Sequence, residues 1–355
     1  MAARGFHSLP VARVDRLTSD AAAVTFAVPT PLREEFAFRP GQTLTVRRPG
    51  DPTGARRSYS ICARVGDAPR IGVREVPGGS VSSWLVRSVR PGDVVEVQPP
   101  SGTFTPDPGA AGAHVLIGAG SGITPLLSIA SSLLSSGADT SVTLLYGNRR
   151  ADTVMFADEV ADLKDAYPAR MQLVHVLSRE PREIELFSGR LDAVKLGSLL
   201  PAVVPDVAGV AGWWLCGPFG MVTGAVDVLR GFGVARDRIH RELFYVEDSP
   251  PPLAGHAEPS FTGEGAEVTV ILDGRKTRVT VPDGSRILDA AQRARPDLPF
   301  ACKGGVCGTC RAVLREGKVT MRRNFALEDS ELAAGYVLTC QSLPAADTLV
   351  VDYDS

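Results

Sequence analysis

Four cysteines near the end of the chain have the type and spacing of an iron–sulfur ligand set. Cys302 is followed after four residues by Cys307, after two more by Cys310, and after a long gap by Cys340. Four thiolates in a C-x4-C-x2-C…C pattern ligate the two irons of a 2Fe-2S cluster. The spacing therefore predicts a centre that accepts and releases one electron at a time.

Glycines lie between these cysteines, as a loop wrapped closely around an anionic cluster requires. Gly304, Gly305 and Gly308 allow backbone N–H groups to approach the cluster and allow positive φ angles.

Structural zinc is the alternative, but zinc ribbons favour two separated C-x2-C pairs. This region has one such pair and no histidine nearby. We therefore expect the iron–sulfur cluster.

The segments around the cysteines are expected to form a small sheet with one helix. Residues 267–281 alternate like two strands around an Asp273–Gly274 turn. Residues 285–296 indicate a short helix capped by Ser285, and a closing strand is expected near the C-terminus. Hairpin, helix, cysteine loop and closing strand resemble the β-grasp fold of plant-type ferredoxins over residues 266–355.

Upstream of the cysteines, a glycine-rich segment indicates a sheet that could bind a nucleotide, and such a nucleotide could supply electrons to the cluster. Residues 114–137 predict a strand, a tight turn and a helix, an arrangement that aims a helix N-terminus at a phosphate in an open α/β sheet. Gly118, Gly120 and Gly122 give G-x-G-x-G instead of G-x-G-x-x-G, so an ordinary tight turn is the alternative.

Arginines that follow the next two strands bear on the choice of nucleotide. Arg149 lies where a Rossmann NAD site usually has an acidic residue for the ribose 2′-hydroxyl, and Arg179 follows the third strand. Arginine suits a 2′-phosphate, so we expect NADPH. NADH is less favoured but stays open, because arginines after strands are common on protein surfaces.

Cys216 ends an apolar strand and precedes Gly217 and Pro218. A lone cysteine in such a strand is more often core filling than a site residue. Ligands of open α/β sheets bind at the carboxyl ends of the strands, at the rim where Thr124 is also expected. We therefore expect Cys216 to line the nicotinamide.

A nicotinamide delivers two electrons together as a hydride, whereas the cluster accepts one, so a flavin is expected between them. The first hundred residues contain short β-runs separated by turns, which predicts a barrel. These runs are residues 22–28, 42–48, 56–64, 69–76 and 93–100.

Two motifs within this predicted barrel are candidates for holding the flavin. Alternation along a strand places Arg57 and Tyr59 on one face, where a guanidinium can pair with a pyrophosphate and a phenol can lie on an aromatic ring. Gly78 and Gly79 precede Ser82 at the start of a predicted helix, an arrangement that suits an anion. An ordinary half-buried strand and a plain turn-to-helix junction are the alternatives.

Together, the ordered motifs resemble the ferredoxin-NADP reductase superfamily, in the group with a ferredoxin domain fused at the C-terminus. Residues 146–168, 301–312 and 332–341 are most similar to the reductases of phenylacetyl-CoA epoxidase complexes. The resemblance implies FAD, NADPH and a di-iron oxygenase that accepts the electrons. The reductase of a ring-hydroxylating or steroid-hydroxylating oxygenase is the alternative.

The resemblance also implies roles for single residues. Arg57 would bind the FAD pyrophosphate, Tyr59 would pack on the isoalloxazine, and Phe244 would lie close to it, although the family's usual E-R-F is replaced here. The predicted catalytic residues are Ser60, Thr124 and Cys216. Ser60 would lie near the N5 edge of the flavin, and Thr124 and Cys216 would flank the nicotinamide. Gly79, Val81 and Ser82 would hold the diphosphate from the other side. The full predicted cofactor-binding set is Arg57, Ser58, Tyr59, Ser60, Gly78, Gly79, Val81, Ser82, Gly120, Gly122, Thr124, Arg149, Arg179, Cys216, Gly217 and Phe244.

The predicted organisation is therefore multi-domain. An antiparallel β-barrel flavin domain covers residues 1–108, and an α/β parallel-sheet nucleotide-binding domain covers residues 109–247. Residues 248–265, rich in Pro, Gly and Ser, are expected to be a flexible linker, and residues 266–355 are the β-grasp ferredoxin domain.

Composition argues against several other classes of protein. A formal net charge of -2 and a pI near 6.2 give no basic field for nucleic acid. No stretch approaches the roughly 18 apolar residues of a membrane span and the start lacks an apolar signal region, so we expect the cytoplasm, where thiols stay reduced. A redox-sensing regulator or a zinc-stabilised binding module would have no use for flavin and nucleotide motifs in series.

Overall fold

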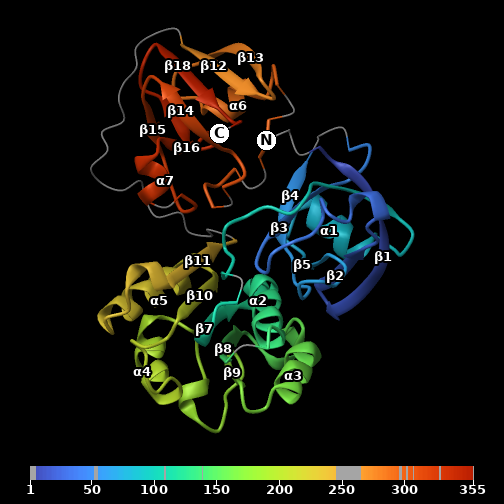
Figure 1. Ribbon diagram of the computed structural model, residues 1–355, viewed down its shortest axis with the longest axis vertical. Helices are drawn as coiled ribbons and strands as arrows, with labels where there is room; N and C mark the ends of the chain where they lie inside the picture. Colours follow the sequence, from blue (N-terminus) through green and yellow to red (C-terminus); the bar gives the residue numbers. More distant parts are fainter. Residues whose placement is uncertain are drawn as a thin grey trace. The chain divides into compact units, whose positions relative to one another are not determined.

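The computed structural model describes residues 5–51, 55–107, 109–137, 139–244, 265–295, 298–300, 303–306, 308–327 and 329–354. The chain divides into two compact units, a first unit of Phe6–Tyr245 and a second unit that contains the residues from Val246 onward (Figure 1). None of the helices in the described ranges has the length and apolar content that crossing a bilayer requires. Apart from Gly265, the predicted linker lies outside the described residues.

Six antiparallel strands form a closed barrel at the start of the first unit. They are β1 (His7–Thr18), β2 (Ala21–Phe26), β3 (Thr43–Arg47), β4 (Arg56–Ser60), β5 (Arg70–Arg74) and β6 (Val94–Val97). The strands hydrogen-bond in the order β4-β3-β6-β1-β2-β5, and a bridge between Ile61 and Ile71 joins the two outer strands. The bridge closes the sheet, and the predicted antiparallel barrel is confirmed. Helix α1 (Ser80–Arg87) and the 3-10 turn η1 (Thr30–Leu32) connect strands of the barrel.

Strand β2 buries both of its faces. Val24 and Phe26 lie in the core of the barrel with no exposed surface. Ala21 and Ala23 point the other way, because successive side chains of a strand alternate between faces. They belong to a second core that includes Leu126 of helix α2. The barrel wall is therefore packed against the rest of the first unit.

A parallel five-stranded sheet forms the rest of the first unit. Its strands are β7 (Gly112–Ala119), β8 (Thr140–Asn148), β9 (Met171–Leu177), β10 (Gly212–Gly217) and β11 (Ile239–Leu243), in the order β11-β10-β7-β8-β9. Figure 1 shows helices α2 (Ile123–Ser135) and α3 (Ala157–Ala166) on one side of the sheet and α4 (Ala193–Val203) and α5 (Phe219–Gly231) on the other. The strand order reverses between β7 and β10, and the crevice at their carboxyl ends is where such sheets bind ligands. The short 3-10 turns are η2 (Gly120–Gly122), η3 (Ala151–Thr153), η4 (Glu185–Phe187) and η5 (Arg236–Arg238).

The second unit is a mixed sheet with the β-grasp arrangement. Its strands are β12 (Ala266–Leu272), β13 (Arg275–Val281), β14 (Arg311–Glu316), β15 (Val319–Met321), β16 (Tyr336–Leu338), β17 (Ser342–Pro344) and β18 (Thr348–Asp352), with helices α6 (Ile287–Ala291) and α7 (Asp329–Ala333). Five strands run in the order β13-β12-β18-β14-β16, with β18 parallel to β12. The fold class predicted from the sequence is thus confirmed in all three of its parts.

Two local predictions for the second unit have different outcomes. The hairpin is confirmed, since Asp273 and Gly274 have φ angles of 55° and 69°, as a two-residue turn with two left-handed positions needs. The helix prediction is wrong at both ends, because α6 covers only Ile287–Ala291 and follows Arg286 as its N-cap. The backbone N–H of Ser285 instead donates to Pro282 O at 3.0 Å, so Ser285 closes a turn before the helix.

Candidate active site

The N-terminus of helix α2 touches the end of strand β10 at Gly122. A Cβ atom on this residue would lie 2.1 Å from the backbone oxygen of Cys216 and 2.6 Å from its carbonyl carbon. Only glycine permits this approach, so the predicted Gly122 and Cys216 lie side by side at the crevice between β7 and β10. Thr124 lies in the first turn of the same helix, is buried, and its hydroxyl donates to Ser121 O at 3.0 Å.

No side chain caps the N-terminus of α2, whose N-cap residue is Gly122. The first N–H groups of a helix have no partner within the helix, and together with the helix dipole they suit an anion. The backbone N–H of Ile123 donates to Gly120 O and Ser121 O, so the turn η2 leads directly into the helix. This glycine-rich helix start, which has no side-chain cap, fits a nucleotide phosphate. Gly122, Thr124, Cys216 and Gly217 are the residues that would hold it here.

A carboxyl group that the sequence patterns do not indicate joins two of the predicted catalytic residues. Glu242 lies directly opposite Cys216 in the parallel register of β11 and β10. The hydroxyl of Ser60, from barrel strand β4, donates to Glu242 Oε2 at 3.1 Å. Ser60, Cys216 and Glu242 therefore meet although they are far apart in the sequence. Predicting the role of Glu242 from the sequence would require knowing how strands β10 and β11 pair. The motif that contains Phe244 indicates only an aromatic residue near the flavin.

Burial controls the protonation of this group of side chains. Burial raises the pKa of Glu242 to about 7, and the hydrogen bond from Ser60 opposes part of that rise. Burial, and secondarily the nearby charge of Glu242, raises the pKa of the Cys216 thiol well above its ordinary value. Cys216 is therefore a neutral thiol at physiological pH and not a nucleophilic thiolate. Glu242 can hold or release a proton near pH 7.

The predicted flavin residues of β4 lie on the barrel wall. Arg57 is exposed and its Nη1 donates to Arg56 O at 2.7 Å. The hydroxyl of Ser58 pairs with Thr45 Oγ1 at 2.9 Å. Tyr59 is half-buried against the barrel core, and burial raises the pKa of its phenol. The exposed guanidinium of Arg57 fits an anionic partner such as a pyrophosphate, whose binding there stays a prediction.

The glycine turn before helix α1 forms a tight loop. Gly78 has a φ angle of 74°, and Gly79 is the N-cap of the helix with no side-chain cap. The hydroxyl of Ser82 accepts from the backbone N–H of Val76 at 3.1 Å and donates to Gly79 O at 3.3 Å. Ser82 thus holds the loop in shape, and Val81 beside it is buried. The uncapped helix start fits a diphosphate, and direct contact of Ser82 with it stays a prediction.

The two predicted arginines of the nucleotide site lie at the carboxyl ends of adjacent strands. The backbone N–H of Arg179 donates to Arg149 O at 2.8 Å, and both side chains are exposed. Two exposed arginine side chains from adjacent strand ends fit a nucleotide phosphate. Gly120 lies at the same end of the sheet with a φ angle of 56°, and Phe244 packs against the core that contains helix α2.

Two of the four predicted cluster ligands are described by the structure. Cys310 and Cys340 are both buried in the core of the second unit, whereas Cys302 and Cys307 lie outside the described residues. The cysteine loop turns through left-handed positions at Gly305 and Gly308, with φ angles of 80° and 64°. These two glycines confirm the expectation that the loop needs positive φ, and the curvature fits a loop wrapped around a small cluster.

Gln341, absent from the predicted set, connects Cys340 to the cysteine loop. Its buried Nε2 has three acceptors, Lys303 O at 2.9 Å, Cys340 O at 2.8 Å and Cys340 Sγ at 3.4 Å. An N–H directed at a cysteine sulfur stabilises a thiolate ligand. In the sequence, the position of Gln341 next to Cys340 is the only indication of this role.

A second hydrogen-bonded chain supports Cys310. The hydroxyl of Tyr353 donates to Thr339 Oγ1 at 2.7 Å, and Thr339 Oγ1 donates to Cys310 O at 2.9 Å. The described residues around Cys310 and Cys340 thus fit a 2Fe-2S cluster held by thiolates, with hydrogen bonds that orient the ligands.

Three family models match successive parts of the chain. An oxidoreductase FAD-binding domain matches residues 8–105, an oxidoreductase NAD-binding domain matches residues 116–227, and a 2Fe-2S iron-sulfur cluster binding domain matches residues 270–345. The predicted FAD, nicotinamide nucleotide and 2Fe-2S cluster are confirmed. The preference for NADPH over NADH stays a prediction.

Similar proteins match over nearly the whole chain. One of the subunits of the 1,2-phenylacetyl-CoA epoxidase of Escherichia coli is 41% identical over 99% of this chain and 98% of that protein. The ferredoxin reductase component of the 3-ketosteroid-9-alpha-monooxygenase of Rhodococcus rhodochrous is 35% identical over 97% of this chain and 96% of that protein. The structure of phthalate dioxygenase reductase has a TM-score of 0.60 at 24% identity and covers 98% of both chains, which supports the fold.

Proposed function

Because the chain belongs to the oxygenase reductases of the ferredoxin-NADP reductase superfamily, we propose that it delivers electrons to a di-iron phenylacetyl-CoA epoxidase. It is an oxidoreductase, the reductase component of an oxygenase system. The observation that carries the choice of acceptor is 41% identity to the epoxidase protein over 99% of the chain, compared with 35% to the steroid monooxygenase reductase. A steroid-hydroxylating oxygenase is therefore the second candidate acceptor.

When bound, the flavin takes up paired electrons from the nicotinamide and releases them singly, and the cluster carries one electron at a time. In this proposal, Ser60, Thr124 and Cys216 surround the reacting rings. The neutral thiol of Cys216 excludes water, and the glycine contact beside it fixes the approach of α2. Ser60 donates to Glu242 Oε2, and burial raises the pKa of this carboxyl to about 7, so Glu242 can take up or release a proton within the first unit.

NADPH is the proposed electron donor, with NADH less favoured. The proposal is supported by the exposed side chains of Arg149 and Arg179 at adjacent strand ends, since a 2′-phosphate carries charge that a ribose hydroxyl lacks. Changing both arginines to alanine should weaken NADPH binding and leave NADH binding nearly unchanged. Equal loss for both nucleotides in anaerobic titrations would contradict the proposal.

The domain boundaries belong to the same proposal: a flavin domain of residues 1–108, a nucleotide domain of residues 109–247, a linker of residues 248–265 and a ferredoxin domain of residues 266–355. A division of the chain after Tyr245 and three family models in this order support them. A cytoplasmic location also stays part of the proposal.

The deciding experiment supplies the reduced protein to purified oxygenases. The holoprotein is mixed anaerobically with NADPH or NADH, and reduction of the flavin and the cluster is followed by absorbance. Oxygen, phenylacetyl-CoA and a di-iron epoxidase are then added, with a 3-ketosteroid oxygenase and its substrate as the parallel arm. Product formation coupled to NADPH consumption only in the first arm supports the proposal, and coupling only in the steroid arm contradicts it.

Cys310→Ser provides the matched control for the route of the electrons. The variant should lose electron delivery to the oxygenase because it lacks a predicted cluster ligand. Reduction of small two-electron dyes should continue, because the dye takes electrons from the flavin. Full oxygenase activity in Cys310→Ser would show that the cluster is not on the route.

A further inference from the structure

Three alternate residues of strand β5 face the nucleotide-binding half of the first unit. Ile71 and Val73 are fully buried in the barrel core, so alternation turns Arg70, Gly72 and Arg74 away from it. None of these three residues belongs to the predicted cofactor-binding set. Each of them contacts a different segment of the parallel-sheet half.

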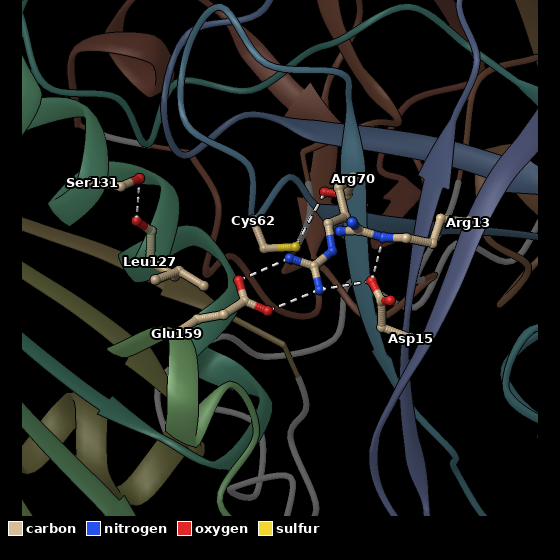
Figure 2. Close-up of polar contacts among 7 residues, drawn as sticks. All are labelled: Arg13, Asp15, Cys62, Arg70, Leu127, Ser131 and Glu159. Carbon is tan, nitrogen blue, oxygen red and sulfur yellow. Dashed lines mark hydrogen bonds and ion pairs between the residues drawn. The ribbon is translucent and has the colours of Figure 1, made fainter. Parts of the chain in front are cut away.

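Arg70 makes the first of these contacts, with helix α3. Its Nη1 and Nη2 donate to the two carboxylate oxygens of Glu159 at 2.8 and 2.9 Å, and Nη2 also donates to Asp15 Oδ2 at 3.2 Å (Figure 2). The guanidinium lies 5.3 Å from the ring centre of Phe156. Arg70 is only 9% exposed, whereas the side chain of Glu159 is 39% exposed, so the pair is buried on its arginine side and open to solvent on its carboxylate side. A bidentate pair fixes orientation as well as distance.

Gly72 and Arg74 continue the row of contacts toward the predicted nicotinamide site. A Cβ atom on Gly72 would lie 2.5 Å from Thr124 Cγ2 and 2.8 Å from Phe156 Cζ, so the barrel strand touches the start of α2. Arg74 Nη2 donates to Thr153 O at 2.7 Å. The strand therefore contacts α3, the residue Thr124 and the turn η3 in sequence.

Beside Arg70, the barrel and the nucleotide-binding half are separated by a cavity. A cavity of about 710 Å³ borders the fork and is lined by both halves, including Cys62, Arg70, Leu127, Ser131, Glu159 and Tyr167. Figure 2 shows Cys62 and Asp15 on the barrel side of the fork and Glu159 on α3. Across the groove, the barrel is also tied to α2, since Ser128 Oγ donates to Ala63 O at 2.6 Å and the backbone N–H of Val65 donates to Ser132 Oγ at 3.1 Å. The Arg70–Glu159 pair is the charged, bidentate connection to α3.

We propose that β5 is a docking strand that sets the orientation of the nucleotide-binding half on the flavin barrel, with Arg70 and Glu159 as positioning residues for nicotinamide-to-flavin transfer. The inference rests on the proposed placement of the nicotinamide at Thr124 and Cys216. Loss of Arg70 removes the cation that Glu159 and Asp15 share, whereas loss of Glu159 leaves Arg70 paired with Asp15 on the barrel and removes its link to α3. A misplacement of about 1 Å between reacting groups can lower a rate about 100-fold.

The test compares the fork with a matched pair on the same groove. The fork variants are Arg70→Met, Glu159→Gln, the double variant and the conservative Arg70→Lys. The control is Arg64→Met with Asp67→Asn, an exposed pair 3.3 Å apart that lines the same cavity but lies wholly on the barrel. For each holoprotein, single-turnover flavin reduction is measured over a range of NADPH concentrations, which separates the limiting rate from the dissociation constant.

We expect the limiting rate to fall about 10- to 100-fold in Arg70→Met and in Glu159→Gln, with the NADPH dissociation constant within about twofold of wild type. The double variant should be no slower than the slower single variant, since both changes break one pair. Arg70→Lys, which keeps the charge but loses the fork, should be intermediate, and the control pair should match wild type. Limiting rates within twofold of wild type in both single variants would overturn the proposal.

A second readout does not depend on flavin reduction. Amide hydrogen exchange of residues 157–166 in the holoprotein without nucleotide should speed up in the fork variants and not in the control. If wild type fails to reduce its flavin with either nucleotide, the proposed function fails, and the exchange measurement still decides the docking role. Unchanged exchange in Arg70→Met and in the double variant would overturn it.

Discussion

Replacing Gly122 with alanine would place a methyl group where the structure has a backbone carbonyl. The new Cβ would lie 2.1 Å from Cys216 O and 3.0 Å from Gly217 N, and neither atom can rotate away. Ordinary carbon contacts need about 3.5 Å, so helix α2 and strand β10 would have to separate by about 1.4 Å. This shift falls at the crevice where the nicotinamide is proposed to bind.

Two effects of Gly122→Ala can be estimated. Overpacking of a well-packed region costs about 1–3 kcal/mol, and each kcal/mol lowers the melting temperature of a unit of this size by about 2–4 °C. A displacement of about 1 Å at the reacting groups lowers flavin reduction by about 100-fold. The assays are thermal unfolding of the holoprotein and anaerobic single-turnover reduction by NADPH.

Gly197→Ala is the matched control, because Gly197 lies inside helix α4 and a Cβ there would meet no atom within 4 Å. Alanine in a helix interior is favoured over glycine by about 1 kcal/mol, so this variant should melt at the same or a higher temperature and react normally. If Gly122→Ala behaves like Gly197→Ala in both assays, the backbone approach does not constrain the site and the reasoning is refuted.

Two further variants test single side chains. Glu242→Gln removes a carboxyl whose folded pKa of about 7 lies above its unfolded value, so the stabilisation that wild type shows at low pH is lost as pH rises through 7. The unfolding free energy of wild type relative to the variant, measured in urea, should fall by about 2–3 kcal/mol between pH 5 and 8, and parallel pH curves would contradict this. Gln341→Leu removes the N–H directed at Cys340 Sγ, so the cluster midpoint potential should become about 40–60 mV more negative in an EPR-monitored titration. An unchanged potential with an unchanged visible circular dichroism spectrum would show that this hydrogen bond does not tune the cluster.

The features that sequence could predict are those written into short contiguous stretches. The glycine turn before α2 and the Asp273–Gly274 hairpin each depend on neighbouring residues, and each has the expected local structure in the described chain. The cysteine spacing is equally local, and a 2Fe-2S family model matches residues 270–345. Strand β1 is not indicated by its sequence, because Pro10 and Arg13 interrupt its apolar alternation. Its 12 residues become a strand only through pairing with β2 and β6.

The residues that sequence could not indicate depend on contacts between distant segments. Glu242 meets Ser60 across 182 residues of chain, and Arg70 meets Glu159 across 89. Neither pair has a characteristic spacing or motif in the sequence. The contact between Glu242 and Ser60 depends on the register of parallel strands, and the contact between Arg70 and Glu159 depends on how the two halves of the first unit pack together. The predicted start of helix α6 is wrong for a local reason, because Ser285 can close a turn as well as cap a helix.

The two buried faces of β2 determine how the chain could be cut into fragments. A fragment ending after the barrel would expose to water the barrel's own members of the core shared with α2, which are Ala21, Ala23, Cys62 and Phe104. The described residues of the second unit contain an apolar core of their own, which includes Val268, Leu288 and Val351. Truncation is therefore expected to yield a stable C-terminal piece and a stable two-cofactor piece, whereas the isolated barrel should aggregate.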